Sequence, residues 1–227
     1  DLAHDVPAGG IEAAAYLLQR SYTQFPEGCV HVAVVDPGVG SARRILAAQL
    51  DGHTFLAPDN GLLGPLLEAH PEAEVRSVES PRLRSASVAP TFHGRDVFAP
   101  AAAHLAAGGS LGDVGPRVEA ELARPGPVRD ADGIRGRVLL VDRFGNLITN
   151  VPRALLAAAG DPRALVVRCG AAVLRGLVET FSDVPRDELL AYVGSGDHLE
   201  IAVNGGRASD TLGLGEDAAV RLEGEDA

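Results

Sequence analysis

The sequence predicts two domains: an α/β N-terminal domain with a central, mostly parallel sheet and flanking helices, and a smaller all-β C-terminal domain, a sandwich or barrel. Residues 30–35 form a nearly all-apolar, mostly β-branched run, typical of a strand buried on both faces of a parallel sheet. Beyond residue 136, short apolar runs alternate with Asp-, Gly- and Pro-rich turns, as in small β domains. We place the domains at residues 1–114 and 136–227, joined by a linker at 115–135 that is rich in proline and charge.

The N-terminal half contains helical and hairpin patterns around this central strand. Apolar residues from Ile11 to Tyr22 recur at helical spacing, which predicts a helix. The Asp51-Gly52 pair separates apolar runs at 45–50 and 53–57, a strong hairpin signal. The remaining elements expected here are a helix over 62–69, a strand over 75–78 and a helix from about Asp96 to Ala107.

The C-terminal half has the spacing of short strands. Only residues 152–159 have a helical pattern there. The expected strands are 137–142, 146–150, 165–169, 189–193, 199–203 and 218–222.

Composition limits the classes of function. The 227 residues carry 20 basic and 31 acidic side chains, a net charge of −11. This argues against nucleic acid as a partner, because phosphate binding needs basic patches. No apolar run approaches the length of a membrane span, so no membrane association is expected. Cys29 and Cys169 lie far apart with no metal-type spacing, which favours reduced thiols and a cytoplasmic location.

Asp36 marks the first candidate site. It follows the apolar run 30–35, and Pro37-Gly38 turns the chain directly after it. Open α/β sheets place ligands at the carboxyl ends of their strands, so a carboxylate there predicts a binding or catalytic role. A carboxylate that only caps the turn explains the same residues equally well.

Five motifs in order carry a resemblance to a known family. They are the run 30–44 around Asp36, Ala57 to Leu63, Thr91 to Pro100, Asp142 to Asn150, and Leu199 to Gly206. Together they resemble the S-adenosylmethionine (SAM) hydrolases that form adenosine, also called SAM hydroxide adenosyltransferases. These are related to the fluorinating and chlorinating enzymes that act on the same substrate. The resemblance covers nearly the whole chain.

The resemblance implies that water attacks the ribose C5′ of SAM in line, giving adenosine and methionine without a cofactor or metal. The catalytic positions it implies are Asp36, Arg43 and His93. A histidine can relay a proton near neutral pH, and arginine is a permanent cation that can stabilise hydroxide. Without the resemblance, the sequence favours Arg43 as a solvated charge beside Arg44, and a histidine at a helix entry explains His93 equally well.

The resemblance also implies substrate-binding positions. Asp142 would hold the methionine ammonium, Phe144 and Asn146 the adenine, and Ser195 the methionine. The other positions it implies are Asp59 and Asn60 at the ribose end, Phe92 and Gly94 beside His93, Phe181 stacked on adenine, and the backbone of Asn204 and Gly205 at the adenine edge. Turn chemistry is a competing explanation for Asp59, Asn60 and Asp142.

Three alternatives remain open. A halogenase is disfavoured because the halogenating relatives carry Tyr at the position of His93, and Gly94 offers no hydroxyl to a halide. A metal-dependent hydrolase is conceivable from Asp36, Asp59, His93 and Asp96, although their spacing is not diagnostic. A non-catalytic protein that binds adenosine or SAM is the third.

The resemblance also implies two features of the whole protein. Family members form trimers with active sites between subunits, so a homotrimer is expected. They also carry an upstream strand and helix with an Asp that clamps the ribose. The sequence contains no Met, so we expect Asp1 not to be the native start.

Overall fold

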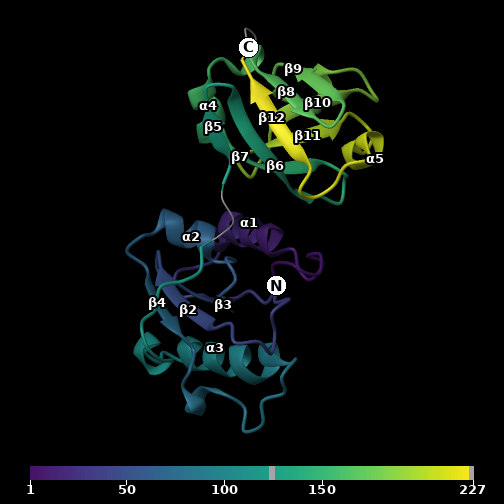
Figure 1. The fold of residues 1–227 in the computed structure, drawn as a ribbon. Helices are drawn as coiled ribbons and strands as arrows, with labels where there is room; N and C mark the ends of the chain where they lie inside the picture. Colours follow the sequence, from purple (N-terminus) through teal and green to yellow (C-terminus); the bar gives the residue numbers. More distant parts are fainter. Residues whose placement is uncertain (123–125, 225–227) are drawn as a thin grey trace. The chain divides into compact units, whose positions relative to one another are not determined.

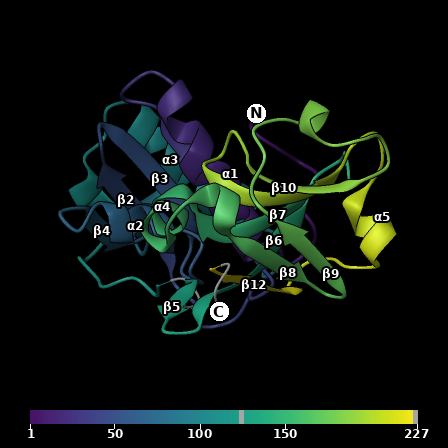
Figure 2. The ribbon, with the colours of Figure 1, turned by 90° about the horizontal axis from the view of Figure 1, so that it is seen from above.

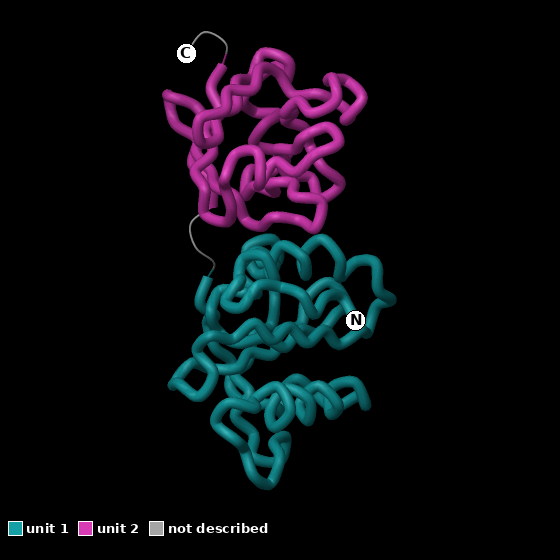
Figure 3. The backbone as a smooth tube through the Cα atoms, turned by 90° about the vertical axis from the view of Figure 1, so that its right-hand side faces the viewer, with its two compact units in different colours: residues 1–124 teal, residues 125–227 magenta. Residues whose placement is uncertain are grey.

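The chain folds into two compact units. The computed structural model describes residues 1–122 and 126–224. One unit comprises residues 1–124 and the other residues 125–227 (Figure 3). Each has its own apolar core.

The first unit places a four-stranded sheet between two helical layers (Figure 1). Its strands are β1 (Val30–Val32), β2 (Ile45–Leu50), β3 (His53–Pro58) and β4 (Glu74–Ser77). Its helices are α1 (Ile11–Ser21), η1 (Tyr22–Gln24), α2 (Gly64–Ala69), η2 (Pro81–Leu83), the π-helical turn η3 (Gly94–Phe98), α3 (Ala99–Ala106) and η4 (Leu111–Asp113). The expected helices and the hairpin are therefore present.

The prediction of a mostly parallel sheet is wrong. The strand order is β1-β3-β2-β4, and β1–β3 is parallel while β2–β3 and β2–β4 are antiparallel. The reason is the hairpin: a two-residue loop can join only antiparallel strands. Asp51 and Gly52 both have positive φ, 48° and 73°, as a type I′ turn requires.

The expected burial of residues 30–35 on both faces is also wrong. Strand β1 covers only Val30–Val32 and is a terminal strand of the described sheet. Val32 and Val34 are each 45% exposed. A hollow of about 610 Å³ lies along this stretch, between it, α1 and the first residues of the chain. An apolar β-branched run therefore identified the strand but not its place in the sheet.

Alternating side chains of the sheet separate two cores in the first unit. Leu46 and Ala48 face α1 and α2, in a cluster with Leu18 and Leu66. The intervening residue Ala47 faces the other layer; that cluster comprises Ile45, Ala47, Leu56, Val78, Val97, Phe98, Ala101 and Val114. This period of two is the side-chain alternation of a strand.

The second unit is a curled antiparallel sheet of eight strands. Its strand order is β10-β11-β7-β6-β12-β8-β9, with β5 paired to β6. The end strands β9 and β10 contact one another, so the sheet nearly closes into a barrel. Figure 2 shows β12, β8 and β9 side by side along it. The strands are β5 (Val128–Asp130), β6 (Gly133–Val141), β7 (Leu147–Pro152), β8 (Val166–Cys169), β9 (Ala172–Arg175), β10 (Leu189–Val193), β11 (His198–Val203) and β12 (Ala219–Glu223).

Within residues 126–224, four helical segments connect strands of this sheet: α4 (Arg153–Ala159), η5 (Pro162–Ala164), η6 (Phe181–Asp183) and α5 (Ala208–Leu212). The six expected strands and the helix at 152–159 are confirmed to within a few residues. Strands β5 and β9 and helix α5 were not expected, because runs of three to five residues show too little periodicity.

The predicted linker 115–135 contains ordered contacts on both sides of residues 123–125, which lie outside the described residues. In the first unit, Ser77 N donates to Pro116 O at 2.9 Å and Val118 N to Val75 O at 3.1 Å. In the second unit, β5 and the start of β6 fall within the same predicted range.

Candidate active site

Asp36 and Arg43 form a bidentate ion pair across one turn. Arg43 Nε donates to Asp36 Oδ1 at 2.8 Å, and Arg43 Nη2 donates to Asp36 Oδ2. Both side chains are largely buried, 10% exposed for Arg43 and 5% for Asp36. Two parallel bonds fix the guanidinium in one plane, which a single lysine nitrogen cannot do.

His93 joins the same pair from a different part of the chain. Its Nδ1 lies 3.0 Å from Arg43 Nη2. A guanidinium can only donate, so Nδ1 accepts and the proton of the neutral imidazole is on Nε2. The structure thus brings together Asp36, Arg43 and His93, the three side chains singled out as catalytic.

Glycine at position 40 allows the two loops that carry these residues to touch. Gly40 has φ +81°, and a Cβ there would lie 2.9 Å from Pro90 O. Ser41 reinforces the turn, because its hydroxyl donates to Gly38 O at 2.7 Å and accepts from Arg43 N at 3.2 Å. The turn after Asp36 is therefore shaped to place Arg43 against the loop that ends at His93.

The neighbours of His93 are open to their surroundings. Phe92 is 57% exposed, and Arg95 lies over its ring, with 5.0 Å from Cζ to the centroid. A Cβ at Gly94 would meet nothing within 4 Å. The space around Gly94 on the side where a Cβ would lie is therefore open.

Asp59 and Asn60 hold the scaffold behind this site. Asp59 Oδ2 accepts from Arg44 Nε at 2.7 Å, and its Oδ1 accepts from Glu121 N at 2.7 Å. Asn60 Nδ2 donates to Val35 O at 3.0 Å, directly before Asp36. The described contacts of both residues are thus with the protein, and Asn60 ties the end of β3 to the segment that carries Asp36.

In the second unit, Asp142, Phe144 and Asn146 share one tight turn. Asp142 Oδ1 accepts from Phe144 N at 2.8 Å and Asn146 N at 2.9 Å, and Oδ2 accepts from Asn146 Nδ2 at 3.0 Å. This is the turn chemistry that competed with ligand binding. Phe144 nevertheless projects from the turn and is 71% exposed, which is unusual for a large apolar side chain.

Asn204 is bonded to the segment that follows η6, the helical turn that contains Phe181. Asn204 Nδ2 donates to Val184 O at 2.9 Å, which fastens the end of β11 to the segment after η6. Asn204 N and O are bonded to Glu188 O and Asp187 N at 2.9 and 2.7 Å. Gly205 follows with φ +80°. Ser195 lies in the turn between β10 and β11.

A partly buried pair, Tyr192 and Glu200, packs beside Phe181 and was not expected from the sequence. The Phe181 ring packs edge-on against Tyr192, with centroids 5.3 Å apart. The Tyr192 hydroxyl donates to Glu200, a carboxylate only 6% exposed. The only sign of this pair in the sequence is Glu200, a single acidic residue within the apolar run 199–203.

The four residues considered as metal ligands do not gather into one cluster in the described structure. Asp59 pairs with Arg44, and Asp96 pairs with Arg95 at 2.6 Å. Within residues 1–122 and 126–224, no three His, Cys, Asp or Glu side chains gather in a way that could hold a metal ion. In that same part of the chain, none of the helices has both the length and the apolar character needed to cross a membrane.

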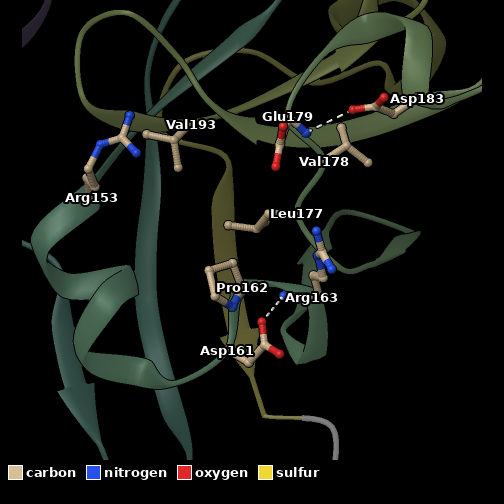
Figure 4. A pocket seen from close by; sticks show the side chains of 9 residues that line it. All are labelled: Arg153, Asp161, Pro162, Arg163, Leu177, Val178, Glu179, Asp183 and Val193. Atoms are coloured by element: carbon tan, nitrogen blue, oxygen red, sulfur yellow. Dashed lines mark hydrogen bonds between the residues drawn. The ribbon is translucent and has the colours of Figure 1, made fainter.

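A second hollow, of about 690 Å³, lies in the C-terminal unit (Figure 4). Pro162, Leu177 and Val193 give it an apolar lining. Two of the charged residues that line it form hydrogen bonds within the protein. Arg153 Nε donates to Asp197 at 2.7 Å, and Asp183 accepts from Glu179 N at 3.1 Å. None of the predicted site residues lines it.

Two family models match the chain. The SAM hydroxide adenosyltransferase N-terminal domain matches residues 1–115, and the C-terminal domain of the same family matches residues 136–221.

Known proteins agree with this match. The chain is 43% identical to an (R)-S-adenosyl-L-methionine hydrolase of Thermus thermophilus, over 98% of this chain and 86% of that protein. It is 28% identical to a fluorinase of an Actinoplanes species, over 90% of this chain and 80% of that protein. A solved structure from Thermotoga maritima, described as an uncharacterized conserved protein, superimposes with a TM-score of 0.86 at 35% identity, over 98% of this chain and 87% of that one. The chain therefore belongs to the SAM hydroxide adenosyltransferase family, with the fluorinases as more distant relatives.

Proposed function

We propose that this protein hydrolyses S-adenosylmethionine to adenosine and methionine. The observation that carries the proposal is the closed network of Asp36, Arg43 and His93 in a chain 43% identical to a named SAM hydrolase. The name of that relative specifies the (R) form of the substrate, and we propose the same preference here.

In the proposed mechanism a water molecule beside Arg43 and His93 attacks the ribose C5′ in line with the C5′–S bond. The sulfonium is already an activated leaving group, so neutral methionine departs without an acid behind it. The chain has only to position the water and take its proton. In the proposal the attacking water enters between Arg43 Nη2 and His93 Nδ1, so the Nδ1 lone pair that now faces Arg43 accepts the proton of the water as the O–C5′ bond forms and the C5′–S bond breaks. The guanidinium stabilises the hydroxide character that develops on the water. Asp36 holds Arg43 in place and balances its charge.

The second unit supplies substrate recognition in this proposal. Asp142 receives the methionine ammonium, while Phe144 and Phe181 contact the adenine. The exposure of Phe144, 71%, supports a role as an aromatic platform. Asn146, Ser195, Asn204 and Gly205 complete the binding positions, as do Asp59, Asn60, Phe92 and Gly94 beside the catalytic network. No metal or cofactor takes part.

We extend the proposal to the organisation of the protein. The N-terminal domain would comprise residues 1–114 and the C-terminal domain residues 136–227, with 115–135 as the linker. A cytoplasmic homotrimer with active sites between subunits is the assembly implied by the resemblance. Activity per subunit would then fall on dilution, whereas full activity of a monomer would contradict it.

The decisive experiment is product chromatography after incubation with SAM and chloride, without added metal and with EDTA. The (R) and (S) sulfonium forms are tested separately. Adenosine and methionine, absent with His93→Ala and unchanged with the exposed control His4→Ala, would establish the hydrolase. A 5′-chloro product would identify a halogenase, loss of turnover with EDTA a metal enzyme, and binding without turnover a SAM-binding protein.

A further inference from the structure

The loop that carries His93 has no regular structure of its own. Residues 84–92 form neither helix nor strand, and His93 is the first residue before η3. The bond from His93 to Arg43 depends on where this loop lies. Something else must therefore fix the loop against η3.

The carboxylate of Asp96 provides that fixing. Asp96 Oδ2 accepts from Ala89 N, seven residues earlier, at 2.8 Å. Ser85 N donates to the backbone O of Asp96 at 2.8 Å. One residue of η3 thus holds both the start and the middle of the loop, three positions beyond His93. The side chain is 3% exposed, so it is enclosed by the segment it holds.

Asp96 also orients Arg95, two residues after His93. Arg95 Nε and Nη2 donate to the two carboxylate oxygens at 2.6 and 3.0 Å. The same guanidinium lies over the ring of Phe92. The hydrogen bonds from Arg95 and from Ala89 N lower the pKa of the Asp96 carboxyl to about 2, so it stays ionised throughout the working range of the protein.

We infer that Asp96 is a positioning residue for the proposed hydrolysis: through the loop 85–92 and through Arg95 it holds His93 within hydrogen-bond distance of Arg43. This inference rests on the proposed function. The carboxylate of Asp96 accepts hydrogen bonds from Ala89 N and Arg95, so we expect it to act on the geometry of the loop. A displacement of an ångström in a catalytic group is enough to slow a reaction by about 100-fold.

The test is Asp96→Asn in the full chain, with Asp113→Asn as the matched control. Asp113 is also a capping carboxylate paired to a basic side chain, with bonds to Ser110 N and His104. We expect kcat to fall about 10- to 100-fold in Asp96→Asn, with a smaller rise in KM because Phe92 lies in the loop that Asp96 holds. The pH profile of kcat keeps its shape, because Asp96 does not titrate near neutrality. Wild-type kcat, or a profile of altered shape, would overturn the inference.

A second readout does not depend on activity. In ¹⁵N-histidine NMR spectra, assigned with His93→Gln, the His93 ring signal shifts or broadens in Asp96→Asn, and that of His53 does not. Should Asp96→Asn fail to fold, Arg95→Ala replaces it, since the Arg95 side chain is 65% exposed. An unchanged His93 signal in the folded variant overturns the inference. A wild-type protein without turnover overturns the proposed function instead, and the NMR comparison still decides the positioning.

Discussion

Arg43 Nη2 lies 3.0 Å from His93 Nδ1 while the same nitrogen donates to Asp36. One guanidinium therefore connects two side chains that are 57 residues apart in the sequence. Groups that act as one unit show strongly non-additive effects when they are removed. Asp36, Arg43 and His93 should therefore behave as a unit in kinetics.

Arg43→Lys should lower kcat by about 100-fold, because an ammonium cannot hold both oxygens of Asp36 and still reach His93. Adding Asp36→Asn should cost much less than it does in the wild-type background. The measurement is adenosine release at saturating SAM for the two single variants and the double variant. Arg82→Lys, an exposed charge in η2, serves as the control and should leave kcat unchanged. Additive losses would show that Asp36 acts independently of Arg43.

Asp59→Ala should destabilise the first unit by about 2 kcal/mol, because it removes the carboxylate that accepts from Arg44 Nε and from the Glu121 amide. The contribution is moderated by the exposure of Arg44, whose side chain is 41% exposed. Urea unfolding measures the loss, and Glu68→Ala on the exposed face of α2 provides the comparison. Unchanged stability would contradict the structural role of these two bonds, and a rise in KM would support the proposed place of Asp59 at the substrate as well.

Acid should destabilise the protein through His31, which is buried against His53 with 3.1 Å between Nε2 and Nδ1. Burial, and then the charge of His53, lower the pKa of His31. Its other neighbours are Phe25, Phe55 and Tyr22, whose hydroxyl bonds Asp51.

The direction in which stability changes with pH follows from proton uptake at His31. Below pH about 6.5 the unfolded chain binds a proton at His31 that the folded protein does not, so stability falls as the pH drops. His31→Gln should flatten the dependence of the urea midpoint on pH between 7 and 5. His4→Gln, at an exposed histidine, should leave that dependence as it is. Equal slopes for wild type and His31→Gln would refute the role of the buried pair.

The sequence predicts local structure well where a short signal suffices. Asp51-Gly52 determines both the turn and the antiparallel pairing of β2 with β3, because both residues must adopt positive φ. The apolar run 30–35 is a weaker signal. It indicates a strand, but whether its neighbours cover Val32 and Val34 depends on residues far away in the sequence.

For the candidate site too, some features could be predicted from the sequence and others could not. The resemblance identified Asp36, Arg43 and His93, and the structure brings them together. The partners of Asp59 and Asp96 were not predictable, because Glu121 and Ala89 enter through backbone amides that have no residue-specific signature. Buried carboxylates recruit such amides only once the fold has placed them.

Phe144→Ala should raise KM for SAM without loss of stability. At 71% exposure its ring adds little to the core, so the free energy of unfolding should change by less than about 0.5 kcal/mol. Stacking of an aromatic ring on a base contributes about 1–3 kcal/mol, which corresponds to a rise in KM of about 5- to 150-fold. Initial rates across SAM concentrations measure KM, and Val173→Ala, at another exposed apolar residue of the second unit, is the control. An unchanged KM would remove Phe144 from the substrate site, and the exposed ring would then need a different partner. Phe144→Tyr, which keeps the aromatic face, should restore KM if stacking is the cause.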